Sequence, residues 1–241
     1  MDTRPGQQAL TVIAIALTFG SGAADVASFT RLGDVFTSVM TGNIVLWGLA
    51  AARGSLTLFS HTAVAIVGYI GGVAAGTWIA HGFRAADPGE DQDQAAALPD
   101  HVKRALLAEL ALLAGFAAGW EVSGASPAGW AQYCLLPVLA AAMGVQASAV
   151  KDMGLAEVST TYLTGTLTGL VASLARPGQD TSYGLRRVGV LIGLVAGASL
   201  CGLLVATAAS AVPALLLAAL VVTLVLAWRP GWLGLGDGAG R

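Results

Sequence analysis

The longest run of the chain without a charged residue extends from Val188 to Trp228, over 41 positions. A helix needs about 20 consecutive apolar residues to cross a bilayer. This run is therefore long enough for two crossings, with a natural break at Pro213. Only 11% of the whole chain is charged, whereas an average soluble domain carries roughly 25% charged residues. The sequence predicts an all-α, polytopic transmembrane helix bundle.

Four further stretches are almost free of charge, and they lie at 35–52, 54–80, 122–150 and 158–175. The apolar stretches together predict about eight helices, with seven as the alternative, at 8–28, 36–52, 60–83, 104–124, 130–151, 159–175, 186–208 and 212–228. The second and sixth helices are short or interrupted. The loop at 84–103 is acidic and the tail at 229–241 is rich in glycine, so we expect both to be flexible.

The charge and the motif content exclude several classes of function. The formal net charge is −2, which gives no indication of nucleic-acid binding. Cys134 and Cys201 both lie in apolar runs, and we interpret them as small hydrophobic residues. The sequence contains no metal-binding motif and no catalytic constellation. We expect a protein that is not an enzyme and that needs no metal or cofactor.

The chain repeats itself at an offset of 123 residues. The segment "LGDVFTSVMTGN" at 32–43 aligns with "LAEVSTTYLTGT" at 155–166, and eight of the thirty positions from 24 to 53 are identical. Internal repeats are common in membrane transporters. The offset predicts two halves, 8–124 and 130–228, in which helices one to four correspond to helices five to eight.

The number of helices in each half determines how the halves are related. Four is even, so both halves should have the same orientation, with a pseudo-two-fold axis along the membrane normal. One helix more or fewer would invert the relation. With the N-terminus inside, seven Lys and Arg residues fall on the inner side and five on the outer side. By that narrow margin, the positive-inside rule places both termini in the cytoplasm.

The third and seventh predicted helices each carry three glycines at a spacing of four. The six residues are Gly68, Gly72, Gly76, Gly189, Gly193 and Gly197. This spacing aligns the glycines of each helix on one face, which lets a second helix backbone approach closely. We predict close helix packing there, either within the chain or between the subunits of a homo-oligomer.

The segment "SGAADVASFTRLGDVFTSVMTGNIVLWGLA" at 21–50 resembles the signature of the YoaK-like family of bacterial membrane proteins. The matching positions are Asp25, Gly33, Val35, Phe36, Met40, Thr41, Gly42 and Asn43. The resemblance extends from about residue 10 to residue 228. It implies a multi-helix protein of the bacterial cytoplasmic membrane, and it implies no substrate because the family is a domain of unknown function.

Two polar triplets lie at equivalent points of the two halves, inside apolar stretches. They are Thr41-Gly42-Asn43 and Thr164-Gly165-Thr166. Irregular backbone at membrane depth is tolerated only where protein or a watery cavity covers it, and paired helix breaks indicate a transporter's binding site. One hypothesis is that both triplets unwind and bind a solute across a shared cavity. The alternative is that the two glycines are packing points in unbroken helices.

Several other polar side chains lie in or near the predicted membrane spans. Asp25 is a lone carboxylate in the first helix, where a charge costs at least about 2.5 kcal/mol on insertion scales. Lys151 should lie at a similar depth on the equivalent helix, so we predict an ion pair between them. A proton- or ion-coupling role for Asp25, or an interfacial location, is the alternative. Gln146 is a candidate substrate contact, and Glu109 and Glu121 are interpreted as solvated helix ends.

Two classes of function fit these observations. The first is a small-solute transporter or permease of the bacterial cytoplasmic membrane, which should enclose a polar cavity that touches both triplets. The second is a non-transporting scaffold or regulatory subunit that acts through helix–helix contacts and is packed solid at that point. The expected partners are the lipid bilayer and an unidentified small solute.

Overall fold

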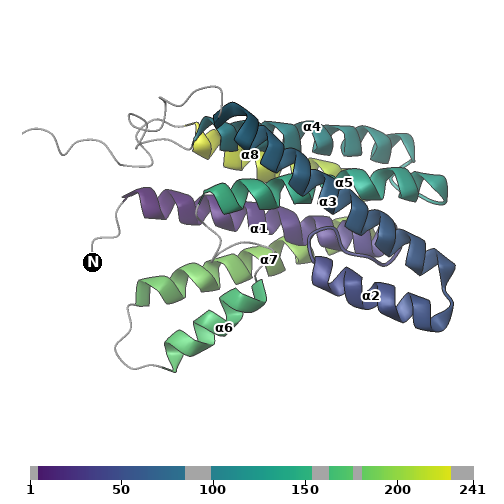
Figure 1. Cartoon of the computed structure of the whole chain (residues 1–241), viewed down its shortest axis with the longest axis horizontal. Coiled ribbons are helices and arrows are strands. Elements are labelled where there is room, and N and C mark those ends of the chain that lie inside the picture. Colours follow the sequence, from purple (N-terminus) through teal and green to yellow (C-terminus); the bar gives the residue numbers. More distant parts are fainter. Residues whose placement is uncertain (1–4, 85–98, 154–162, 176–180, 229–241) are drawn as a thin grey trace, which may run out of the picture.

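The computed structural model describes residues 5–84, 99–153, 163–175 and 181–228 of the chain. These residues form eight α-helices and one short 3-10 helix, η4, and they contain no strand (Figure 1). The elements are α1 (Pro5–Arg31), α2 (Met40–Arg53), α3 (Leu56–Arg84), α4 (Asp100–Val122), α5 (Trp130–Asp152), α6 (Leu163–Leu174), α7 (Thr181–Thr207), η4 (Ala209–Ala211) and α8 (Val212–Ala227). The predicted polytopic helix bundle is confirmed. Most of the acidic loop and the whole glycine-rich tail lie outside the described residues.

Six of the eight helices are long and apolar enough to cross a membrane, and α2 and α6 are not. With 14 and 12 residues and a rise of about 1.5 Å per residue, these two helices are roughly 21 and 18 Å long. The hydrocarbon core of a bilayer is about 30 Å thick. Each half of the chain therefore contributes three crossings and one short helix.

The two halves run in opposite directions through the bundle, which corrects the parallel relation expected from the sequence. Ser21 of α1 contacts Gln146 of α5 at 2.7 Å, and the carbonyl of Arg31 accepts a 2.9 Å hydrogen bond from Gln132. The numbers rise along α1 while they fall along α5, so the equivalent helices are antiparallel. The reason is that α2 and α6 add no crossing, which leaves an odd number of crossings per half and an inverted repeat.

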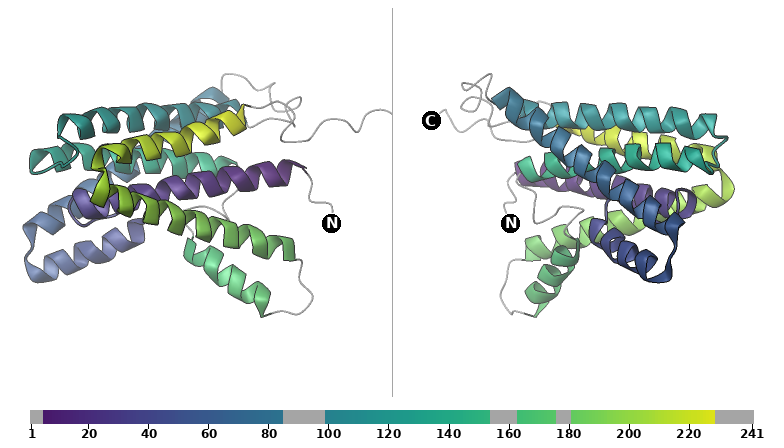
Figure 2. Two further views of the ribbon diagram at one scale, coloured as in Figure 1. Left: turned by 180° about the vertical axis from the view of Figure 1, so that it is seen from behind. Right: turned by 45° about the vertical axis from the view of Figure 1, so that its right-hand side comes forward.

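The helix pairs of the bundle follow the inverted relation. Side chains of Thr11 and Arg31 in α1 bond Arg186 and Val205 in α7 at 2.6 and 2.9 Å, so these two helices are parallel and side by side (Figures 1 and 2). In the same way α3 packs along α5, where the hydroxyl groups of Ser60 and Tyr133 are 2.7 Å apart. Helix α1 corresponds to α5 and α7 corresponds to α3, so an exchange of the two halves turns the α1–α7 pair into the α3–α5 pair.

The glycine-bearing faces of α3 and α7 form these two contacts. A Cβ atom at Gly72 would collide with the backbone of Ala141 in α5, and one at Gly197 would collide with the backbone of Phe19 in α1. The glycine spacing therefore allows α3 to pack closely on α5, and α7 on α1, within one chain. A homo-oligomer stays a prediction, and it would need a surface other than these two faces.

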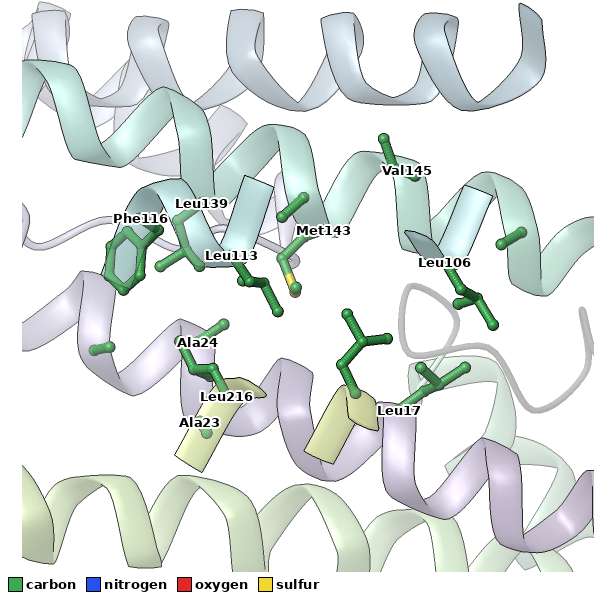
Figure 3. Packing of buried hydrophobic residues seen from close by; sticks show 14 of the residues in the cluster. Leu17, Ala23, Ala24, Leu106, Leu113, Phe116, Leu139, Met143, Val145 and Leu216 are labelled. Carbon is green, nitrogen blue, oxygen red and sulfur yellow. The ribbon is translucent and has the colours of Figure 1, made fainter. Parts of the chain in front are cut away.

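The interior lies between α1, α4, α5 and α8, and apolar side chains fill most of it. Figure 3 shows Leu17, Leu113, Met143 and Leu216 converging from these four helices. Large apolar side chains also cover the outside of the bundle, and Trp78 of α3 is 76% exposed. Such a surface is expected of a chain whose outer face contacts lipid.

Candidate functional site

The segment between α1 and α2, residues 32–39, is not helical and folds back onto α1. Leu32 and Val35 are fully buried, and the ring of Phe36 stacks on Phe29 of α1 with 5.1 Å between centroids. Gly33 has φ of +102°, and a Cβ atom there would meet the ring of His61. Only glycine can combine this backbone conformation with this close approach.

Asp25 anchors this segment to α1. Its carboxylate accepts four hydrogen bonds, from the backbone N–H of Thr37 (2.8 Å) and of Ser38 (2.8 Å) and from both hydroxyl groups (3.2 and 2.6 Å). The side chain is 7% exposed. A buried carboxylate needs several donors when it has no cation, and the segment supplies them.

The predicted ion pair between Asp25 and Lys151 is wrong. Lys151 is exposed in the last turn of α5. Among the described residues, Lys103 pairs with Asp100, and the imidazole of His101 lies 4.0 Å from the carboxylate of Asp152. The expected match in depth assumed parallel halves. Because α1 and α5 are antiparallel, the last turn of α5 lies far from Asp25.

Asn43 performs a similar task from the other side of the segment. Its Oδ1 accepts a 2.9 Å hydrogen bond from the N–H of Phe36, and its Nδ2 donates a 2.6 Å hydrogen bond to the carbonyl of Phe36. Helix α2 begins at Met40, so the triplet 41–43 forms its first turn and the irregular backbone precedes it. Both ends of the side-chain amide are bonded within the chain.

The second triplet lies in the first turn of α6. Thr164 and Gly165 are exposed and Thr166 is buried. Helix α2 packs on α3 and α6 on α7, and the two short helices run from the middle of the molecule toward its opposite ends (Figures 1 and 2). In these views the first turns of α2 and α6, which carry the triplets, are the ends of the two short helices that face each other, and neither triplet lines the cavity described below. A role of either triplet in binding a substrate stays a prediction.

A different set of polar side chains meets at the centre of the bundle. The hydroxyl group of Ser21 in α1 donates to Oε1 of Gln146 in α5 at 2.7 Å. Nε2 of Gln146 donates to Oε1 of Glu109 in α4 at 2.8 Å. The exposed fractions of Ser21, Gln146 and Glu109 are 0%, 3% and 1%. This central polar chain connects three membrane-spanning helices from both halves.

A cavity of about 10 Å³ adjoins Glu109, which is room for roughly one water molecule. Its lining residues come from the four helices of the interior and are Ala16, Leu17, Gly20, Glu109, Leu113, Met143, Gln146, Leu216, Ala219 and Leu220. Glu109 and Gln146 are the polar members of this lining. Oε2 of Glu109 is buried and has no hydrogen-bond partner among the described residues.

The sequence pointed to one member of the central polar chain and missed two. Gln146 was a predicted contact, and it lines the cavity. Glu109 was interpreted as a solvated helix end, which is wrong, whereas Glu121 is exposed as expected. The error came from the predicted start of the helix. Helix α4 begins at Asp100, four residues before the predicted start, so Glu109 lies near the middle of the span and not at its end. Ser21 carried no signal, since serine is common in membrane helices.

These features define a polytopic helical membrane protein with inverted halves and a buried polar centre. Within the described part of the chain, no group of three or more His, Cys, Asp or Glu residues could hold a metal ion.

The family described as "Protein of unknown function (DUF1275)" matches residues 13–228, and the chain belongs to this family. The chain is also similar to "UPF0700 transmembrane protein YoaK" of Bacillus subtilis (strain 168), with 31% identity over 159 residues. That alignment covers 66% of this chain and 64% of the relative, so the chain spans just under two thirds of the relative's length. No solved structure matches the chain. The resemblance read from residues 21–50 is confirmed.

Proposed function

We propose that this protein is a small-solute transporter and not an enzyme, with its substrate site at the central polar chain. The observation that carries the proposal is the hydrogen-bonded set Ser21, Gln146 and Glu109 beside a cavity at the centre of two inverted halves. Ionisable residues inside a membrane bundle are expensive, and they mark solute or ion pathways. Transporters built from inverted repeats bind their substrates near the bilayer midplane, where the repeats meet.

The inverted relation of the two halves also supports a transport mechanism. Two halves with opposite orientation can exchange conformations, so that the same site opens to one membrane face and then to the other. The cavity is lined by α1 and α4 of the first half and by α5 and α8 of the second. Rocking of these halves would open it on either side. The small cavity, with room for about one water molecule, fits a state of such a cycle in which the site is not widely open to either face.

The proposal includes an orientation in the bacterial cytoplasmic membrane. Six described Lys and Arg residues lie at the end of the bundle where α1 begins, and they are Arg84, Lys103, Arg104, Lys151, Arg186 and Arg187. Arg31 and Arg53 lie at the opposite end. The positive-inside rule then favours a cytoplasmic location for the six-residue end and for both termini.

Cysteine accessibility tests the proposal without knowledge of the substrate. In a Cys134→Ser/Cys201→Ser background, Ala219→Cys places a thiol on the cavity, while Ala218→Cys places one on the lipid-facing side of α8. A membrane-impermeant maleimide is applied to right-side-out and to inside-out vesicles, and denatured protein gives the level of complete labelling.

A transporter should show labelling of Ala219→Cys from both faces and none of Ala218→Cys. If Ala219→Cys resists labelling from both faces as Ala218→Cys does, the cavity never opens to water. That result would overturn the transporter proposal and favour the scaffold alternative.

A further inference from the structure

The feature that the proposed function leaves unexplained is the free oxygen of Glu109. Oε1 accepts one hydrogen bond from Gln146, and Oε2 has no partner among the described residues and adjoins the cavity. The residue is tenth in the 23-residue helix α4, and its exposed fraction is 1%. An oxygen so deeply buried and still unbonded is available to a ligand or to a proton.

Among the described residues that line the cavity with Glu109, none carries a charge. Along the cavity, α1 contributes Ala16, Leu17 and Gly20, α5 contributes Met143 and Gln146, and α8 contributes Leu216, Ala219 and Leu220. Helix α3 also packs on α4 but has no residue in the cavity lining. Apart from Glu109, the acidic, basic and histidine side chains of α4 and α5 lie in or next to their terminal turns, at Asp100, His101, Lys103, Arg104, Glu121, Lys151 and Asp152. Asp25 of α1 is engaged with residues 37 and 38.

These surroundings fit a neutral carboxylic acid and not a carboxylate. An ionised carboxyl group in an apolar interior needs a cation or several hydrogen-bond donors. Glu109 has one donor and no cation within the described structure. A proton on Oε2 removes the charge, keeps Oε1 free to accept from Gln146, and directs an O–H group toward the cavity.

We propose that Glu109 is a proton-binding site, which holds a proton in the occluded state and releases it when the cavity opens to water. In the release step the O–H bond at Oε2 breaks, its electron pair stays on the carboxylate, and the proton passes to an entering water molecule as hydronium. The carboxylate is then stable only while water solvates it, so the cavity cannot close again until a proton returns. The part of this inference that concerns transport rests on the proposed function: the coupling ion would be a proton.

Infrared spectroscopy of the reconstituted protein at neutral pH tests the protonation directly. The carbonyl stretch of a protonated carboxylic acid is separate from the amide band, and it shifts when water is exchanged for heavy water. We expect this acid band in the wild-type protein, its loss in Glu109→Gln, and its retention in Asp25→Asn, since Asp25 has the donors of an ionised group. An identical acid region in wild type and Glu109→Gln would overturn the inference.

Dicyclohexylcarbodiimide, which partitions into bilayers and reacts with protonated carboxyl groups, provides a second measurement. Mass spectrometry should find the adduct on the peptide that contains Glu109 and not on the peptide that contains Asp25. An adduct confined to Asp25 would also overturn the inference. A missing acid band combined with labelling of Ala219→Cys from both faces would remove the proton site and leave the transporter proposal standing. An acid band without labelling of Ala219→Cys from both faces would leave the proton site standing and remove the transporter proposal.

Discussion

Asp25 and Glu109 are both buried carboxyl groups on membrane-spanning helices, but their surroundings differ. Asp25 accepts four hydrogen bonds from Thr37 and Ser38, which belong to the segment that joins α1 to α2. Glu109 accepts one hydrogen bond, from Gln146, and its second oxygen adjoins a cavity. Four hydrogen-bond donors can stabilise a permanently ionised carboxylate. A single donor is too few for that, so the group can gain or lose a proton.

The comparison teaches that burial alone does not indicate the role of a polar group in a membrane protein. What distinguishes the two carboxyl groups is how completely the chain satisfies each of them. Around residues 32–39 the side chains of Asp25 and Asn43 bond backbone groups that no helix satisfies, which is a structural task. At the centre of the bundle Oε2 of Glu109 has no donor among the described residues, and such exceptions in native structures point to function.

The largest expected effect is the loss of stability in Asp25→Asn. The substitution removes the charge and turns an acceptor into an N–H₂ group that faces N–H and O–H donors of residues 37 and 38. Leaving such buried donors unsatisfied should lower the stability by about 3 kcal/mol. Thermal unfolding in detergent measures the effect. The matched control is Asp34→Asn, the same chemical change at an exposed residue of the same segment, where the melting temperature should stay unchanged.

A double-mutant cycle with Lys151→Met sharpens this prediction. Because Asp25 and Lys151 form no ion pair, the two substitutions should have additive effects on stability. Recovery of stability in the double mutant would show that the two residues interact, and it would contradict the assignment of Asp25 to residues 37 and 38.

Asn43→Ala should have the second-largest effect, also on stability. The substitution leaves the backbone N–H and carbonyl of Phe36 without the partners that the side-chain amide provides. Losing both hydrogen bonds should cost about 2 kcal/mol, measured by the same thermal unfolding. Thr41→Ala is the control, because Thr41 is exposed in the same turn of α2. Wild-type stability of Asn43→Ala would contradict the structural role of the residue and would favour the prediction that it binds a substrate.

The sequence predicted the helices well because bilayer thickness imposes long apolar runs. Each of the eight predicted segments overlaps one helix, and the short second and sixth helices were recognised. The relation between the halves was wrong for a specific reason. Whether 14 residues cross a membrane depends on where the chain turns, and Gly33 and residues 37–38 return the chain toward α1 before α2 begins. Composition does not show such a turn.

The candidate site was less predictable than the fold because it depends on contacts between distant segments. Ser21, Glu109 and Gln146 are separated by 37 to 125 positions along the chain, and no pattern of spacing relates them. The polar triplets had a pattern, and each of them lies in the first turn of a short helix, where Asn43 of the first triplet also bonds the backbone of Phe36. Asp25 was correctly expected to need partners, but they were local donors and not a cation on another helix.

The smallest expected effect on stability is that of Glu109→Gln, and it provides the sharpest test of the comparison. A protonated glutamic acid and a glutamine are nearly the same in shape. The amide oxygen can accept from Gln146, and the N–H₂ group can occupy the place of the O–H group at the cavity. The stability should therefore change by less than about 1 kcal/mol, whereas the same carboxyl-to-amide change at Asp25 should cost about 3 kcal/mol. A strong gain in stability would instead show that an ionised and poorly compensated carboxylate had been removed. A loss as large as that of Asp25→Asn would show that Glu109 is held as firmly as Asp25, and the distinction between the two regions would fail.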